Sequence, residues 1–176
     1  MKPGQILYAR QGGQHVLRLV GDVRQNAMGG YHSAAELAAF IAGLLGQGEV
    51  GPLIVDLAEL EYIDSTHLGL LAQIAVGMQA KGEAPPVIAA PNERISRVLH
   101  EMCLDRLFTF CDSSSSSVPP GQPLPEHRAD ETEGARVVIE AHRALAALSR
   151  ENATRFQDVI ALLEEQAKPE GEETAK

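Results

Sequence analysis

Apolar residues in the first 111 positions recur with two periods, one typical of strands and one typical of helices. Short apolar runs at 5–10 and 15–20 flank a Gln-Gly-Gly-Gln turn, which predicts a β-hairpin. A continuous apolar run at 52–57 is typical of a strand that is covered on both faces of a parallel sheet, and 85–90 predicts the next strand. The segment 104–110 predicts a turn and a last short strand.

Three segments between these strands place apolar residues three and four positions apart, as on one face of a helix. The first begins near Ser33, which has the capping-box spacing to Glu36; the second follows Ser65, and the third starts near Asn92. The order of elements is therefore β-β-α-β-α-β-α-β. Because strand–helix–strand connections need parallel neighbours, we predict an α/β fold, with one domain over 1–111 whose mixed, mostly parallel sheet is flanked by helices.

The pattern changes beyond position 111. Five serines and a proline-rich tract make 112–134 a linker, because such a sequence cannot form a packed core. Residues 135–168 again show apolar positions at spacings of three and four, which predicts one long amphipathic helix. We expect 169–176 to be a disordered tail. Three interpretations of the long helix stay open: it folds back on an apolar patch, it pairs with another copy or another protein, or it is disordered until it binds.

Composition and charge exclude several classes of function. The net charge is −9 and no lysine- or arginine-rich stretch occurs, which argues against nucleic-acid binding. No apolar run approaches the ~20 residues of a membrane span, and the N-terminus lacks the apolar core of a signal peptide. We therefore expect a cytoplasmic protein without direct membrane insertion, whose Cys103 and Cys111 are reduced thiols. No cysteine–histidine spacing suggests zinc, and we expect neither a metal nor a cofactor.

The sequence EYIDSTHLGLL places a run of polar residues between the third predicted strand and the helix after it. In the simplest interpretation, Asp64 or Ser65 caps the helix by accepting hydrogen bonds from its first N–H groups. In a functional interpretation, a hydroxyl at this edge of the sheet can carry a phosphate at little cost to the fold, because a helix N-terminus favours anions. A partner docked there would meet a new charge of about −1.5 to −2. The sequence leaves both interpretations open.

The region from LIVDL at 53–57 to LDRLF at 104–108 resembles STAS domains, the anti-sigma factor antagonist family. The matching features are the VDL…YIDS strand and loop, Gly69 four residues after Ser65, the Lys-Gly pair that ends the helix, and LVGDV at 19–23. The resemblance covers roughly 5–111. It implies the fold that the pattern predicts and, for function, a protein-binding module of a partner-switching pathway.

The resemblance implies that Ser65 is the residue that a partner kinase phosphorylates, with Thr66 as the neighbouring alternative. In the family, the unphosphorylated form binds the kinase-like anti-sigma factor, which releases its sigma factor. Phosphorylation breaks this contact, and a PP2C-like phosphatase restores it. We expect the partner-binding surface to surround Ser65 and to include the loop at 24–32 and the residues Gly21, Asp22, Asp64, Thr66, His67, Asn92 and Glu93.

Two features depart from the family pattern. Thr66 and His67 stand where the family usually has glycine or another small residue, which affects which kinase can dock. We expect His67 to be exposed in the first turn of the helix. The second departure is the helix at 135–168, which a minimal STAS domain lacks, so the resemblance assigns no role to it.

An alternative function is a STAS subunit of a membrane ABC transporter of the lipid-uptake type, in which the same edge binds the ATPase without phosphorylation. An enzyme is not expected. The chain has no glycine loop of the kind that cradles phosphate, and Ser65 and His67, two residues apart on a helix, do not face each other. The other histidines belong to no motif and are expected to be satisfied or solvated: His15, His32, His100, His127 and His142.

Overall fold

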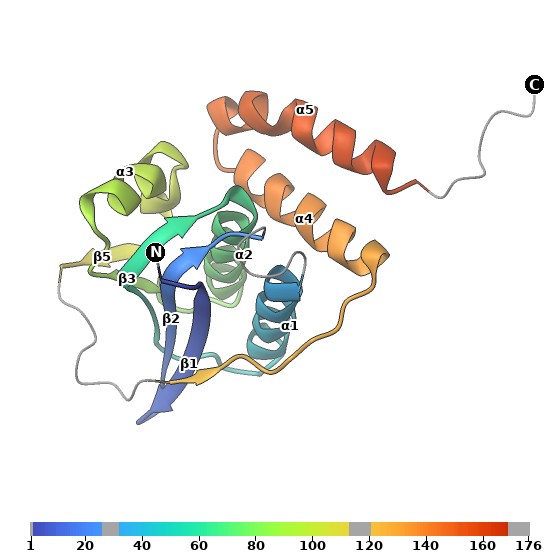
Figure 1. Cartoon of the computed structure of the whole chain (residues 1–176). Coiled ribbons are helices and arrows are strands. Elements are labelled where there is room, and N and C mark those ends of the chain that lie inside the picture. The colour runs from blue at the N-terminus through green and yellow to red at the C-terminus, as the bar shows by residue number, and fades with distance from the viewer. Residues whose placement is uncertain (1, 26–31, 113–120, 169–176) are drawn as a thin grey trace, which may run out of the picture.

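The two apolar runs before the first loop form a hairpin that starts a six-stranded sheet (Figure 1). The computed structural model describes residues 2–25, 32–112 and 121–168. Across the sheet the strand order is β5-β4-β3-β2-β1-β6. Its strands are β1 (Gln5–Gln11), β2 (Gln14–Val23), β3 (Leu53–Ile63), β4 (Val87–Ala89), β5 (Thr109–Cys111) and β6 (Gln122–Pro123).

The strand pairings give the mixed, mostly parallel sheet that the sequence predicts. β1 is antiparallel to β2 and to β6, whereas the pairs β2–β3, β3–β4 and β4–β5 are parallel. The continuous apolar run of β3 is buried between its two neighbours, with Val55 and Leu57 fully inaccessible. The predicted α/β fold is confirmed.

The helices form more than one layer, because α4 and α5 pack on other helices. The helices are α1 (His32–Leu45), α2 (Ser65–Ala80), α3 (Glu93–Glu101), the short 3₁₀ helix η1 (Leu104–Arg106), α4 (Glu131–Ala146) and α5 (Arg150–Gln166). The helices α1 and α2 contact each other, α4 lies across both of them, and α5 packs on α4 (Figure 1). Aliphatic side chains from the sheet and from these helices form one continuous core, as a chain without tryptophan requires.

The prediction of one helix over 135–168 is wrong, because two helices form a hairpin there. The helix α4 begins at Glu131, inside the predicted linker, and ends with Ala147 as its C-cap. Ser149 then caps α5 by accepting a hydrogen bond from the backbone N–H of Asn152. The apolar spacing of three and four runs through this break, so the pattern alone hid it. Of the three interpretations, the structure shows the hairpin folded back on the domain, with Val138, Ala141 and Leu145 buried.

Several boundaries also differ from those predicted. The predicted linker at 112–134 contains β6, which pairs with β1 at Leu7 and Tyr8. The strand β2 runs to Val23 and so includes Gly21 and Asp22, beyond the predicted end at residue 20. Ser33 lies inside α1 and its side chain is buried, so it is not the predicted N-cap. Most of the expected loop at 24–32, and the expected tail at 169–176, fall outside the described residues.

Across the described ranges, none of the helices combines the length and the apolar character that a membrane span needs.

Candidate functional site

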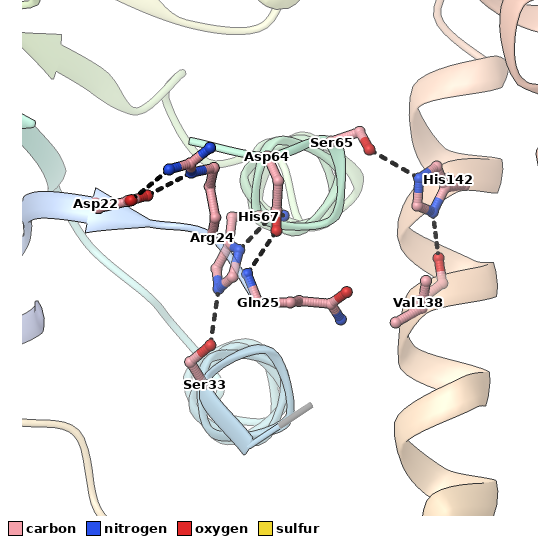
Figure 2. Close-up of polar contacts among 9 residues, drawn as sticks. All are labelled: Asp22, Arg24, Gln25, Ser33, Asp64, Ser65, His67, Val138 and His142. Carbon is pink, nitrogen blue, oxygen red and sulfur yellow. Dashed lines mark hydrogen bonds and ion pairs between the residues drawn. The ribbon is translucent and has the colours of Figure 1, made fainter. Parts of the chain in front are cut away.

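The polar residues of the EYIDSTHLGLL segment lie where β2 and β3 end side by side and α2 begins (Figure 2). Val23 pairs with Ile63 at the ends of the two parallel strands, and the N–H of Asp64 donates to the carbonyl oxygen of Val23 at 3.3 Å. Carboxyl ends of parallel strands are the edge at which α/β sheets place their sites. Ser65, the first residue of α2, therefore stands at this edge.

Asp64 is the N-cap of α2, which settles one of the alternatives that the sequence left open. Its Oδ1 accepts hydrogen bonds from the backbone N–H of His67 at 3.0 Å and from His67 Nδ1 at 2.7 Å, and its Oδ2 accepts from the backbone N–H of Gln25 at 2.7 Å. Burial raises the pKa of the Asp64 carboxyl group, but the hydrogen bonds from His67 and Gln25 outweigh burial, so the net pKa lies below its ordinary value. Asp64 is thus an ionised cap, and the hydroxyl of Ser65 is not needed for capping.

The expectation that His67 is exposed is wrong. Its side chain is fully buried, with Nδ1 on Asp64 and Nε2 3.3 Å from Ser33 Oγ. Thr66 is also buried, at 3% exposure. Most of α2 is buried, because both α1 and α4 pack against it. The side chains of Thr66 and His67, both expected in the partner-binding surface, are therefore inaccessible while the fold is intact.

A residue far away in the sequence, His142 of α4, contacts Ser65. The Ser65 Oγ lies 2.9 Å from His142 Nε2, and His142 Nδ1 lies 2.8 Å from the carbonyl oxygen of Val138 (Figure 2). A carbonyl oxygen only accepts, so Nδ1 carries a hydrogen; Nε2 of the neutral ring is then the acceptor, and the Ser65 hydroxyl donates to it. A serine and a histidine in this arrangement also have the geometry of a nucleophile and its base.

No signal in the sequence points to this pair. The two residues are 77 positions apart, and His142 belongs to no motif. Its position on the apolar side of α4 was visible, and its burial at 6% exposure agrees with a satisfied histidine. The sequence could not show that the hydrogen-bond partner of His142 is Ser65.

The ends of β2 and β3 also carry a cluster of charged side chains beside this junction. Arg24 forms two hydrogen bonds to the carboxylate of Asp22 and lies over the Tyr62 ring, 4.9 Å from its centroid. Arg94 of α3 also lies over that ring, at 4.1 Å. The hydrogen bond from Arg24 lowers the pKa of Asp22. These contacts connect β2, β3 and the start of α3.

The remaining predicted site residues fall into structural and exposed groups. Asn92 caps α3, accepting from the N–H of Ile95 at 2.9 Å and donating to the carbonyl oxygen of Leu60 at 2.8 Å. Glu93 is well exposed.

Gly21 has a positive φ of 69°, and a Cβ there would lie 2.5 Å from the carbonyl oxygen of Lys2, so only glycine fits. The structure therefore brings Gly21, Asp22 and the start of α3 to the same edge, but most of their polar atoms serve the fold.

The Asp64 carboxylate makes the stability of the protein sensitive to acid. Its folded pKa lies below the value of about 3.9 for an unfolded chain, so its contribution is fully present above that pH and is lost as the pH falls through the folded pKa. We expect the free energy of unfolding, measured with urea from about pH 6 to about pH 3, to fall less steeply in Asp64→Asn than in the wild type. If the free energy of unfolding fell equally steeply with pH in both proteins, the lowered pKa of Asp64 would be contradicted. The pKa of Asp22 is also lowered, so Asp22 too loses its contribution to stability in acid, and it does so in both the wild type and Asp64→Asn.

Comparison with known proteins agrees with this fold. A sequence model of the family described as "Mlab, STAS domain" matches residues 6–109, more than half of the chain. No protein with a curated description matches the chain.

Three solved structures share the fold at low sequence identity. One is a putative anti-sigma factor antagonist from Thermotoga maritima, with 22% identity and a TM-score of 0.52 over 64% of this chain and 90% of that one. The anti-sigma factor antagonist SpoIIAA in its unphosphorylated form has 17% identity and a TM-score of 0.52, over 64% and 90% of the two chains. The phosphorylated form of the Bacillus cell fate determinant SpoIIAA has 18% identity and a TM-score of 0.50, over 64% and 94%.

Proposed function

The chain belongs to the STAS-domain family, and on that premise we propose that it is an anti-sigma factor antagonist-like module that binds a serine kinase-like protein and is released by phosphorylation at Ser65. Its role is to hold or free that partner, and the output is a sigma factor or another effector. A PP2C-like phosphatase completes the cycle. The similarity of the fold to that of proteins described as anti-sigma factor antagonists supports this proposal.

One observation carries the choice of Ser65. Asp64 already caps α2, so modification of the hydroxyl of the next residue does not remove the cap. A phosphate on Ser65 would lie near the first N–H groups of α2 and the positive end of its dipole, which tolerate an anion. The fold can therefore accept the modification.

A docked partner would not accept it. The phosphate adds a charge of about −1.5 to −2 beside the Asp64 carboxylate, which is ionised because its pKa is lowered. A partner surface that is complementary to the unmodified site then faces two adjacent anions. Repulsion and the cost of burying them break the contact.

The test uses four full-length proteins that differ only at position 65: wild type, Ser65→Ala, Ser65→Asp, and a protein with phosphoserine installed there. Each is immobilised and exposed to lysate of the source organism. We expect the wild type and Ser65→Ala to retain one kinase-like protein, the phosphoserine form to lose it by at least about tenfold, and Ser65→Asp to lose less, since it adds only one charge. With ATP, the retained protein should phosphorylate the wild type at Ser65 and leave Ser65→Ala unmodified.

Two other outcomes would replace the proposal. Retention of an ABC-type ATPase by all four proteins would make the chain a transporter subunit and Ser65 a plain helix residue. Turnover of an activated ester that both Ser65→Ala and His142→Ala abolish would make it a hydrolase. The hydrolase is favoured as the second candidate function by the 2.9 Å contact between Ser65 Oγ and His142 Nε2.

A further inference from the structure

We propose that the α4–α5 hairpin is an internal competitor for the partner surface, because α4 holds the Ser65 hydroxyl against its own His142 and must be displaced before a protein can reach Ser65. This inference rests on the proposed function, since it assigns a control to the same site. The control is built into the chain and lies beyond the part that matches the family, which ends at residue 109.

The first observation is the contact at the site itself. Ser65 is half-buried, and its Oγ points to α4, where it meets His142 Nε2 at 2.9 Å (Figure 2). The hydroxyl is already engaged by this ring, and the ring is held in place by its second bond, to the carbonyl oxygen of Val138. A kinase must take this hydroxyl into its own active site, in line with the phosphate that it transfers. It cannot do so while α4 lies on the same atom.

The second observation is the close approach of α4 to α2 one turn further along. A Cβ on Gly69 would lie 2.1 Å from the carbonyl oxygen of Ala141 and 2.8 Å from its Cα, so the two helix backbones touch with no side chain between them. The α4 residues on either side, Val138 and Leu145, are buried. Therefore α4 occupies the first two turns of α2, the region beside Ser65 on which a partner would dock.

The third observation is that, among the described residues, the polar contacts of α5 with the domain outside the hairpin gather at Met102, whereas contacts such as that of Arg143 with Glu164, at 2.6 Å, lie within the hairpin. Asn152 Nδ2 donates to the carbonyl oxygens of Met102, at the end of α3, and of Leu145, both at 3.0 Å. The Phe156 ring meets the edge of His142, with 5.5 Å between ring centroids. Removing the tie from Asn152 to Met102 should raise the open population of the hairpin, since a local unit opens at lower free energy than the whole domain unfolds.

Thiol labelling of the full-length chain tests this directly and needs no knowledge of the partner. Ser65→Cys is introduced into a background in which Cys103 and Cys111 are replaced by serine. The rate of reaction is then measured with a small maleimide and with a maleimide carried on a polyethylene glycol chain. We expect the bulky reagent to react much more slowly than the small one, because only the open hairpin admits it.

A loosened hairpin should remove that protection. We expect Asn152→Ala to speed the bulky reagent by about tenfold or more, since the lost buried hydrogen bonds favour opening. The matched control is Thr154→Ala, on the same helix, which removes only a bond from Thr154 Oγ1 to the carbonyl oxygen of Arg150 and should change nothing. Should Asn152→Ala not fold, as judged by circular dichroism, Phe156→Ala takes its place.

The outcomes separate this inference from the proposed function. An introduced thiol at position 65 that reacts equally fast with both reagents, or a rate that is unchanged when the hairpin is loosened, would overturn the competitor role and leave charge-dependent partner binding untouched. A shielded thiol there, in a protein that retains no charge-sensitive partner, would overturn the proposed function instead. The two experiments share no readout.

Discussion

Replacement of Gly69 by alanine is expected to lift α4 off α2 and to cost about 2 kcal/mol of stability. The added Cβ would lie 2.1 Å from the Ala141 carbonyl oxygen, and the neighbouring atoms are all backbone, which cannot rotate away as a side chain can. One of the helices must therefore shift, and the shift also separates Ser65 Oγ from His142 Nε2. Urea unfolding measures the loss of stability, and hydrogen exchange of the α4 amides measures the loss of packing.

The helix propensity of alanine opposes the predicted loss of stability in Gly69→Ala. Alanine is a better helix former than glycine by up to about 1 kcal/mol, so α2 itself gains from the substitution. The matched control is Gly43→Ala in α1, where a Cβ would meet nothing within 4 Å. That variant is expected to be as stable as the wild type or more stable. A Gly69→Ala protein that behaves like Gly43→Ala, with α4 amides still protected, would show that the close approach is not needed.

The sequence predicted the parts of the molecule whose signals are local. Strand runs, helix spacing and the order of elements led to the α/β sheet, and a cap at the start of α2 followed from Asp64 and Ser65 standing at a strand–helix junction. Gly69 was noted only as part of a family motif. The structure gives it a physical reason, because the glycine allows the α4 backbone to lie against α2.

Two of the failures concern the surroundings of α2 and the α4–α5 hairpin. His67 was expected to be exposed, but its ring lies between Asp64 and Ser33 of α1 and is fully buried. The break between α4 and α5 has no glycine or proline, and its only local signal is the cap residue Ser149. The pairing of Ser65 with His142 depends on where α4 docks, and the spacing of residues carries no information about that.

Substitution of Asp64 by alanine is expected to cause the larger loss of stability, about 3–4 kcal/mol, because one carboxylate serves three donors. The variant loses the N-cap of α2, worth about 1 kcal/mol. It also leaves His67 Nδ1, on a fully buried side chain, without its partner at 2.7 Å, at a further cost of about 1–3 kcal/mol. The backbone N–H of Gln25 loses its acceptor as well.

Two matched variants separate these contributions in urea unfolding. Asp130→Ala removes the exposed N-cap of α4, which accepts one hydrogen bond, from the N–H of Glu133 at 2.8 Å, so it should cost only about 1 kcal/mol. Asp64→Asn keeps one oxygen for the cap but turns an amide group toward another donor, and it should fall between the two alanine variants. If Asp64→Ala costs no more than Asp130→Ala, Asp64 is only a cap. If the expected order holds, the Asp64 carboxylate joins β2, β3 and α2 at the residue next to Ser65, and the junction is held by more than a helix cap.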